Sequence, residues 1–228
     1  MAGLFTPLKL RGVTFKNRVV LSPMCQYAAE DGRVGDWHLE HHARFALGGV
    51  GGALVESTGI LPEGRITPDC LGIWDDAQID GLSKIAAIYH RQNAVVGIQL
   101  GHAGRKASST PPWSGGWALP AEDPRGWTTV APSAIAYHED WPVPHALEID
   151  EIAGIVAAFA AAARRAVAAG FDFVEIHGAH GYLIHSFVSP ISNQRTDAYG
   201  GSPENRMRLA VEVAEAVRAA IPADMPLF

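Results

Sequence analysis

The alternation of short apolar runs with helical stretches is the feature that most limits how this chain can fold. Four runs have the length and composition of buried strands: 19–21, 53–56, 94–100 and 171–176. Helical patterns follow them, over 37–47, over 78–92, over 151–169 and from Ser202 onward. Residues 225–228 resemble the opening of a fifth strand. Strict alternation of this kind predicts parallel strands joined by helical crossovers.

The helix ends are marked by glycines and capping residues. Asp150 is predicted to cap the third helix, and Gly170 lies where that helix should stop. Ser202 is predicted to cap the fourth helix, with Pro203 in its first position and Glu204 near its positive end. These signals fix where the loops between strands and helices should begin.

Two α/β architectures fit such a pattern, the doubly wound sheet and the (β/α)8 barrel. A doubly wound dinucleotide domain needs a Gly-x-Gly-x-x-Gly turn between a strand and the helix after it. The glycine cluster at 48–52 has a different spacing, and it follows a helix and precedes a strand. We therefore predict a (β/α)8 TIM barrel, of which residues 1–228 supply about the first four βα units and the start of the fifth strand.

One segment, 101–148, interrupts the alternation between the third strand and its helix. It contains seven of the 15 prolines and four of the six tryptophans of the chain. A loop of this length in a compact domain is usually functional or a small subdomain. We predict that it is a lid or capping insertion over the mouth of the barrel, although packing on its own aromatic side chains is the structural alternative.

Composition and charge exclude several classes of protein. The net charge of -6 gives no basic surface for a nucleic acid, and no apolar run reaches the ~18 residues that span a bilayer. The start of the chain lacks the apolar stretch of a signal peptide, so Cys25 and Cys70 are expected to be reduced and the protein to be cytoplasmic. The histidines of the 38–42 segment are expected on a helix surface near the barrel mouth, and no metal site is expected.

Polar and reactive side chains gather just past the predicted strand ends. In a barrel these carboxyl ends form the active-site face. The residues are Ser22 to Cys25 after the first strand, Ser57 after the second, Gln99 with His102 after the third, and His177 to Tyr182 after the fourth. Each also has a plain structural reading: the histidines could be a metal pair or ordinary polar side chains, Cys25 a small buried hydrophobe, and Gln99 a partner of the barrel backbone.

The run 175–206, which contains Glu-Ile-His-Gly-Ala-His-Gly-Tyr-Leu, resembles the fourth βα loop of the Old Yellow Enzyme family. Ser-Pro-Met-Cys-Gln-Tyr at 22–27, Glu-Ser at 56–57 and Gln-Leu-Gly-His-Ala-Gly-Arg at 99–105 match as well. The similarity extends over essentially the whole chain. Cys25 with Tyr27, and the His-x-x-His spacing, are most similar to the bacterial ene-reductase branch that has a cysteine beside the flavin.

The resemblance implies an FMN-dependent reductase of α,β-unsaturated carbonyl compounds, with NADPH or NADH as hydride donor. It implies that His177 and His180 bind the substrate carbonyl, that Tyr182 donates the proton, and that Tyr27 reaches the substrate. The residues implied to contact the flavin are Ser22, Pro23, Met24, Cys25, Ser57 and Gln99. The complete enzyme is expected to be a homo-oligomer that acts on a small enone.

Two other interpretations remain open on the sequence. A dienoyl-reductase or a flavin-dependent demethylase relative would use the same scaffold for different chemistry. A barrel takes roughly 250 residues, and its phosphate site frequently lies in loops after the seventh and eighth strands. Residues 1–228 are therefore expected to be the N-terminal part of one FMN-binding domain, and a non-catalytic half-barrel that needs a complementing partner is the third possibility.

Overall fold

A four-stranded parallel sheet forms the centre of the computed structural model, which describes residues 3–120 and 122–228. Its strands are β3 (Val20–Leu21), β4 (Gly52–Gly59), β5 (Val95–Gly101) and β8 (Phe173–Ile176), and they lie in the order in which they occur along the chain. Leu227 continues the series, because it pairs in parallel with Val174 of β8. A doubly wound sheet reverses its strand order, so the uniform order agrees with the predicted barrel.

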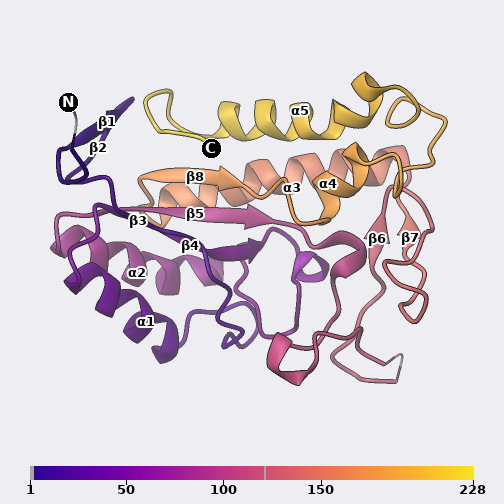
Figure 1. Ribbon diagram of the computed structural model, residues 1–228, viewed down its shortest axis with the longest axis horizontal. Coiled ribbons are helices and arrows are strands. Elements are labelled where there is room, and N and C mark those ends of the chain that lie inside the picture. Colours follow the sequence, from indigo (N-terminus) through magenta and orange to yellow (C-terminus); the bar gives the residue numbers. More distant parts are fainter. Residues whose placement is uncertain (1–2, 121) are drawn as a thin grey trace.

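Long helices connect these strands and cover the outer side of the sheet (Figure 1). They are α1 (Asp36–Leu47), α2 (Ile79–Arg91), α3 (Ile149–Ala168) and α5 (Pro203–Ala220). Successive helices contact each other, α1 with α2, α2 with α3, and α3 with α5. The four predicted helices and the predicted strands are therefore present, with shifts of a few residues at their ends. Each helix in the described part of the chain is too short or too polar to cross a bilayer.

The helix caps agree with the sequence in one case and differ in another. The Ser202 hydroxyl accepts a hydrogen bond from the Asn205 backbone N–H at 3.3 Å, as predicted. Asp150 does not cap α3: the helix begins at Ile149, which makes Glu148 the residue before it. The Glu151 carboxylate accepts the Glu148 backbone N–H at 2.7 Å instead. The side chain of a residue in the first turn therefore provides the hydrogen bond at the start of this helix.

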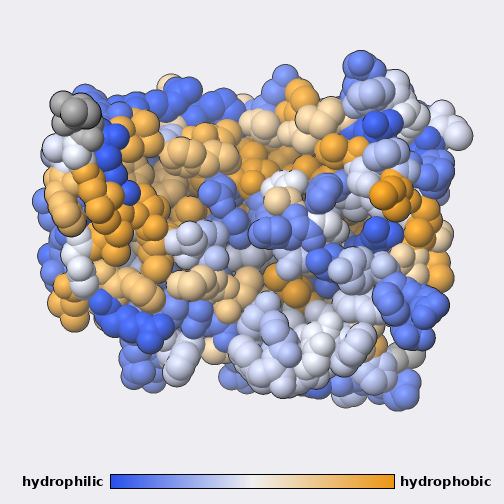
Figure 2. Space-filling model, in the orientation of Figure 1, coloured by the Kyte–Doolittle hydropathy of each residue, from blue (hydrophilic) through white to orange (hydrophobic). Residues whose placement is uncertain are grey.

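The N-terminal hairpin was not predicted from the sequence. It consists of β1 (Leu8–Leu10) and β2 (Val13–Phe15), and it lies where the strands of the main sheet begin (Figure 1). The ring of Phe15 packs on Phe173, with centroids 5.6 Å apart. Apolar side chains gather at this end of the molecule (Figure 2). Two strands of three residues are too short for periodicity to reveal them, and the hairpin covers the amino ends of the strands.

Segment 101–148 contains little regular structure. Its only strands among the described residues are β6 (Val130–Ala131) and β7 (His145–Ala146), which pair in parallel, and it adds two single turns of 3-10 helix. The chain then enters α3, and after β8 it forms the short helix α4 (Leu183–Val188). The segment lies at the carboxyl ends of the sheet strands in Figure 1, opposite the hairpin.

Close packing across the sheet generates a stability prediction at Gly97 in β5. A Cβ atom there would lie 2.3 Å from Cε2 of Phe173, whose ring is almost fully buried. Overpacking of this kind typically costs about 1–3 kcal/mol, so Gly97→Ala should lower the melting temperature measured by circular dichroism. Gly154→Ala is the matched control, because nothing lies within 4 Å of its Cβ position on the exposed face of α3. There alanine should stabilise by ~0.5–1 kcal/mol, and equal melting temperatures for the two variants would contradict the packing.

Candidate active site

The register of the sheet brings the predicted polar residues to one level at its carboxyl edge. Ser57 of β4 lies beside Gln99 of β5, and Gln99 lies beside Glu175 of β8. The Gln99 amide donates to the Glu175 carboxylate at 2.6 Å. The ladder then continues past β8, where the His177 backbone N–H donates to the Leu100 carbonyl at 2.8 Å. Ser57, Gln99 and His177, which lie far apart in sequence, are therefore close neighbours at one edge.

A pair of histidines follows β8. His180 Nδ1 and His177 Nε2 are 3.2 Å apart. The Ala179 backbone N–H donates to His177 Nδ1 at 3.3 Å, so the proton of neutral His177 belongs on Nε2. That N–H then donates to His180 Nδ1, which leaves the Nε2–H of His180 directed outward. Burial, with the nearby charge of Lys106 and His180, lowers the pKa of His177 to about 4. His177 is thus a neutral ring whose N–H is used on His180, and Nε2 is the ring nitrogen of His180 that takes no part in this contact.

Tyr182 completes this group on the same loop. Its ring lies edge-on to His177 with centroids 5.0 Å apart, and 6.3 Å from His180. Burial raises the pKa of Tyr182 above its ordinary range, so the phenol stays protonated at neutral pH. The next residue anchors the loop, because the Leu183 backbone N–H donates to the His102 carbonyl at 3.0 Å. His102 is buried and holds its own turn by accepting the Gly104 N–H at 3.0 Å.

The loop after β3 supplies the opposite side of the site. Tyr27 lies edge-on to Trp113 of the insertion, with centroids 5.5 Å apart, and its φ of 49° is left-handed. His180 has a similar φ of 58°. Left-handed backbone is uncommon for residues other than glycine and concentrates at functional sites. Two of the three residues to which the sequence assigned substrate contact, Tyr27 and His180 but not His177, are therefore held in strained conformations.

The predicted flavin-contacting residues of this loop are mostly accessible. Ser22 and Met24 are exposed, while Pro23 and Cys25 are partly buried. Cys25 and Cys70 are both free thiols, as the sequence indicated. Burial raises the pKa of Cys25, with the neighbouring Cys70 and Glu56 as further causes. The Cys25 side chain is thus a neutral thiol at the rim of the site.

A buried carboxyl group, Glu56, lies beneath that loop. Its Oε1 accepts the Gln26 backbone N–H at 3.0 Å, while its Oε2 has no hydrogen-bond partner. His38 Nε2 lies 4.0 Å from Oε2 and is also unpartnered. Burial raises the pKa of Glu56 to about 8 and lowers that of His38. The sequence signal for this group was an acidic residue at the end of an apolar strand, and its role was missed.

The histidines of α1 do not lie on the helix surface, and that prediction was wrong. His38, His41 and His42 are all buried. The reason is that this face of α1 packs on α2, where His42 Nδ1 lies 2.9 Å from the Tyr89 hydroxyl. Burial lowers the pKa of His42 to about 3, so these rings act as neutral core side chains.

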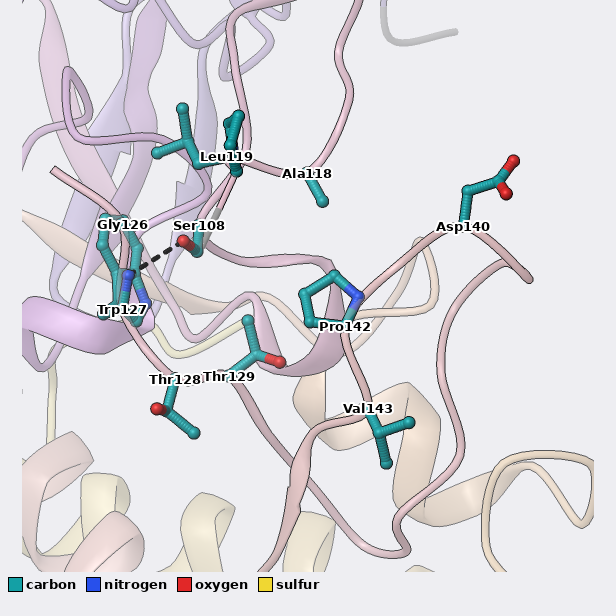
Figure 3. A pocket seen from close by; sticks show the side chains of 11 residues that line it. Ser108, Ala118, Leu119, Gly126, Trp127, Thr128, Thr129, Asp140, Pro142 and Val143 are labelled. Carbon is teal, nitrogen blue, oxygen red and sulfur yellow. Dashed lines mark hydrogen bonds between the residues drawn. The ribbon is translucent and has the colours of Figure 1, made fainter. Parts of the chain in front are cut away.

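Three cavities open along segment 101–148. The one of about 560 Å³ is lined by the insertion itself, and in Figure 3 Ser108 accepts a hydrogen bond from the Trp127 backbone N–H across it, at 3.0 Å. None of the predicted site residues lines it. A smaller cavity of about 240 Å³ has Tyr27 and Tyr182 in its wall, together with Lys106, Tyr137 and residues of the insertion. The third cavity, of about 290 Å³, also has Tyr27 in its wall, and neither His177 nor His180 lines any of the three.

Comparison with known proteins fixes the family. The model of the NADH:flavin oxidoreductase / NADH oxidase family matches residues 3–228. The chain belongs to this family. It is 49% identical over 228 residues to an NADH:flavin oxidoreductase of Gibberella zeae, covering 99% of this chain and 55% of that protein. It is 47% identical over 227 residues to an NADPH dehydrogenase of Geobacillus thermodenitrificans, covering 99% of this chain and 62% of the relative.

Solved structures of family members agree with the fold. Morphinone reductase in complex with tetrahydroNAD superposes with a TM-score of 0.84 at 34% identity, over 100% of this chain and 63% of that one. The Old Yellow Enzyme homologue from Zymomonas mobilis gives 0.83 at 35% identity, over 98% and 62%. The predicted partial barrel is confirmed, and the chain spans less than two thirds of the length of these family members.

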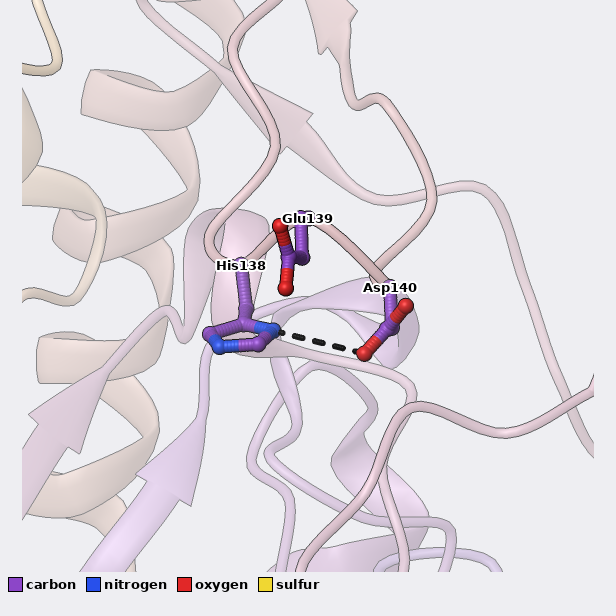
Figure 4. A group of neighbouring side chains, drawn as sticks. All are labelled: His138, Glu139 and Asp140. Atoms are coloured by element: carbon purple, nitrogen blue, oxygen red, sulfur yellow. Dashed lines mark ion pairs between the residues drawn. The ribbon is translucent and has the colours of Figure 1, made fainter.

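A cluster of three adjacent side chains, His138, Glu139 and Asp140, has ligand atoms within 4.8 Å of one another (Figure 4). His138 Nδ1 is 3.8 Å from Asp140 Oδ2. All three side chains are exposed on one loop of the insertion. An exposed run of this composition is an ordinary solvated surface, and we assign it no role.

Glu56 generates a prediction for the dependence of stability on pH. Its pKa is about 8 in the fold against an ordinary 4.5, so between these values the folded protein holds a proton that the unfolded chain has released. The free energy of unfolding therefore falls as the pH rises through that window. Glu56→Gln keeps an acceptor for the Gln26 N–H and should remove this part of the slope in urea titrations at several pH values. Glu215→Gln on the exposed face of α5 is the control, and a slope unchanged by Glu56→Gln would contradict the buried protonated carboxyl.

Proposed function

We propose that the protein is an FMN-dependent reductase that uses NADPH or NADH to reduce the C=C bond of α,β-unsaturated carbonyl compounds. The observation that carries the proposal is the group formed by His177, His180 and Tyr182: two imidazoles in contact, with a protonated phenol against one of them. Such a set provides hydrogen-bond donors for an oxygen that gains negative charge and an acid for the adjacent carbon.

The residues at the strand ends fit a flavin ring. The ring edge of a flavin carries alternating carbonyl oxygens and an N–H group, which call for a side chain that both donates and accepts. Gln99 offers an amide at this edge, and Ser57 offers a hydroxyl beside it. We propose that Ser22, Pro23, Met24, Cys25, Ser57 and Gln99 hold the flavin. When bound, FMN supplies the redox chemistry, taking hydride from the nicotinamide and giving it to the substrate.

His177 and His180 then orient the substrate and stabilise its charge. The backbone N–H of Ala179 holds the His177 ring, and the N–H of that ring, which faces His180 Nδ1, would be shared with the carbonyl oxygen as this oxygen becomes enolate-like. The low pKa of His177 keeps that ring a hydrogen-bond donor rather than a cation. We propose that Tyr27, on the opposite wall, contacts the rest of the substrate.

Tyr182 delivers the proton to the α-carbon. Its raised pKa keeps the hydroxyl protonated until negative charge develops next to it. The product therefore gains a hydride at one carbon and a proton from the phenol at the other, and solvent reprotonates the tyrosine.

We also propose that segment 101–148 is a lid for this site. It places Lys106, Ser109, Thr110, Tyr137 and Trp141 in the wall of the cavity that Tyr27 and Tyr182 line. Trp113 of the same segment packs on Tyr27. Contacts of this kind exclude water from a reacting centre, which strengthens its electrostatic interactions.

The proton donor is tested by Tyr182→Phe in the flavin-loaded protein. Loss of general acid catalysis should slow enone reduction ~10²–10⁴-fold, because the ring remains and only the hydroxyl is removed. Stopped-flow absorbance should show reduction of the flavin by the nicotinamide at nearly the wild-type rate. Equal losses in the two half-reactions would point to a folding defect and refute the role.

The histidine pair is tested with a phenol, whose oxygen mimics the enolate. His177→Ala and His180→Ala should each weaken phenol binding by ~1.5–3 kcal/mol, the range for a lost hydrogen bond to a charged group. His145→Ala, at an exposed histidine that pairs with Glu151 elsewhere on the molecule, serves as the control. Unchanged dissociation constants in both site variants, measured by calorimetry, would remove the pair from the oxygen-binding site.

A further inference from the structure

Lys106 stands at the junction of the insertion and the histidine loop. Its Nζ donates to the His180 carbonyl at 2.8 Å, across 74 residues of sequence. The same Nζ lies 5.1 Å from the ring centroid of Tyr182 and 4.8 Å from that of Tyr137. The ammonium group is therefore fixed between two aromatic rings, close to the predicted proton donor.

The hydrogen-bonding capacity of Lys106 is mostly unused. A lysine ammonium has three N–H donors, and one of them is directed at the His180 carbonyl. No carboxylate lies within ion-pair distance of Lys106 among residues 3–120 and 122–228. The neighbouring Arg105 differs, since it donates to the carbonyls of Ile135 and Ala136 and so serves the fold of the insertion.

The cavity that Lys106 lines carries one positive charge and no negative charge in its wall. It has no acidic side chain in its wall, and Lys106 is its one charged residue. Ser109 and Thr110 direct their hydroxyl hydrogens at backbone carbonyls. Among residues 3–120 and 122–228, the Tyr137 and Tyr182 hydroxyls have no hydrogen-bond partner, so these two hydroxyls, unlike those of Ser109 and Thr110, can donate into the cavity. A ligand with several acceptor atoms and a negative charge would match this set.

We propose that Lys106, with the hydroxyl of Tyr137, forms a subsite for a carboxylate on the substrate, so that the preferred substrates are enones that also carry an acid group. This inference rests on the proposed function and specifies its substrate class. The carbonyl to be activated lies at His177 and His180, and the carboxylate lies on the side of Tyr182 toward the insertion. Ile66, Pro112 and Trp141 provide the apolar wall for the carbon skeleton between them.

A charged carboxylate should bind the Lys106 ammonium group more tightly than a neutral amide of the same shape does. Hydrogen bonds to charged groups are stronger than neutral ones, and the difference corresponds to ~10–100-fold in a dissociation constant. The partial exposure of Lys106 places the expected effect at the lower end of this range. The preference for the carboxylate should disappear when a substitution removes the charge of Lys106. It should persist when a substitution keeps a positive charge near the same place.

The experiment compares two phenols, 4-hydroxybenzoate and 4-hydroxybenzamide, which differ only in this group. Their dissociation constants are measured by calorimetry with the flavin-loaded protein, and the phenol charge-transfer band of the flavin confirms where they bind. The variants are Lys106→Met, which removes the charge, and Lys106→Arg, which keeps it. Lys84→Met on the exposed face of α2, where Lys84 pairs with Asp80, is the matched control.

The wild type should bind the benzoate about tenfold tighter than the benzamide. Lys106→Met should remove most of this difference between the two dissociation constants. Lys106→Arg should retain most of the preference, and Lys84→Met all of it. Because each ratio is taken within one variant, a general loosening of the loop cancels. Equal binding of both phenols by the wild type, or an unchanged ratio in Lys106→Met, would overturn the subsite while leaving the proposed function intact. Absence of a charge-transfer band with either phenol would refute the proposed function itself, and the subsite with it.

Discussion

The parallel register between β4, β5 and β8 is the constraint on which the site depends. Backbone hydrogen bonds set Ser57 beside Gln99 and Gln99 beside Glu175, and the same ladder fixes the start of the histidine loop at His177. Because side chains alternate between the two faces of a strand, a slip of one residue would turn these groups away from each other. The irregularity in pairing between Val55 and Ser57 belongs to this arrangement. It changes the direction of the Ser57 side chain relative to the preceding residues of β4.

The fold supports the site at some expense in stability. Glu56 and His38 are buried with unpartnered polar atoms 4.0 Å apart, and Tyr27 and His180 adopt left-handed backbone conformations. Each is unfavourable alone. Tertiary contacts hold them in place: Trp113 packs on Tyr27, and Lys106 binds the His180 carbonyl. The contacts come from the insertion, so the segment that interrupts the strand–helix alternation also stabilises the parts of the site that the sheet does not reach.

Much of the fold could be predicted from the sequence because long periodic segments carry strong signals. The four long helices and the sheet strands arise from such segments, and Ser202 caps its helix as its side chain chemistry requires. The hairpin and α4 were missed because three to six residues carry no measurable period. The exposed position expected for the α1 histidines was wrong, because polar residue type alone does not reveal that Tyr89 of another helix offers a buried partner.

The candidate site also has a part that the sequence could predict and a part that it could not. Its residues lie near the carboxyl ends of consecutive strands or just past them, so the sequence could place Ser57, Gln99 and His177 at one edge. The contributions of Lys106 and Glu56 depend on contacts between distant segments. Lys106 meets a carbonyl 74 residues away, and Glu56 supports Gln26 from the adjacent strand. No local pattern encodes such pairs, and they became visible only with the three-dimensional arrangement.

The order of the strands also has a consequence for how the molecule is made. Each strand of the main sheet pairs with the main-sheet strand that precedes it in the chain, so each βα unit can dock on a neighbour that has already left the ribosome. The N-terminal hairpin is the exception. Its contacts with the Ala223 and Asp224 carbonyls join residues 212 positions apart at Arg11 and at the neighbouring Gly12. The hairpin is therefore translated long before its partners at Ala223 and Asp224, and it stays without these contacts while the strands of the sheet between them assemble.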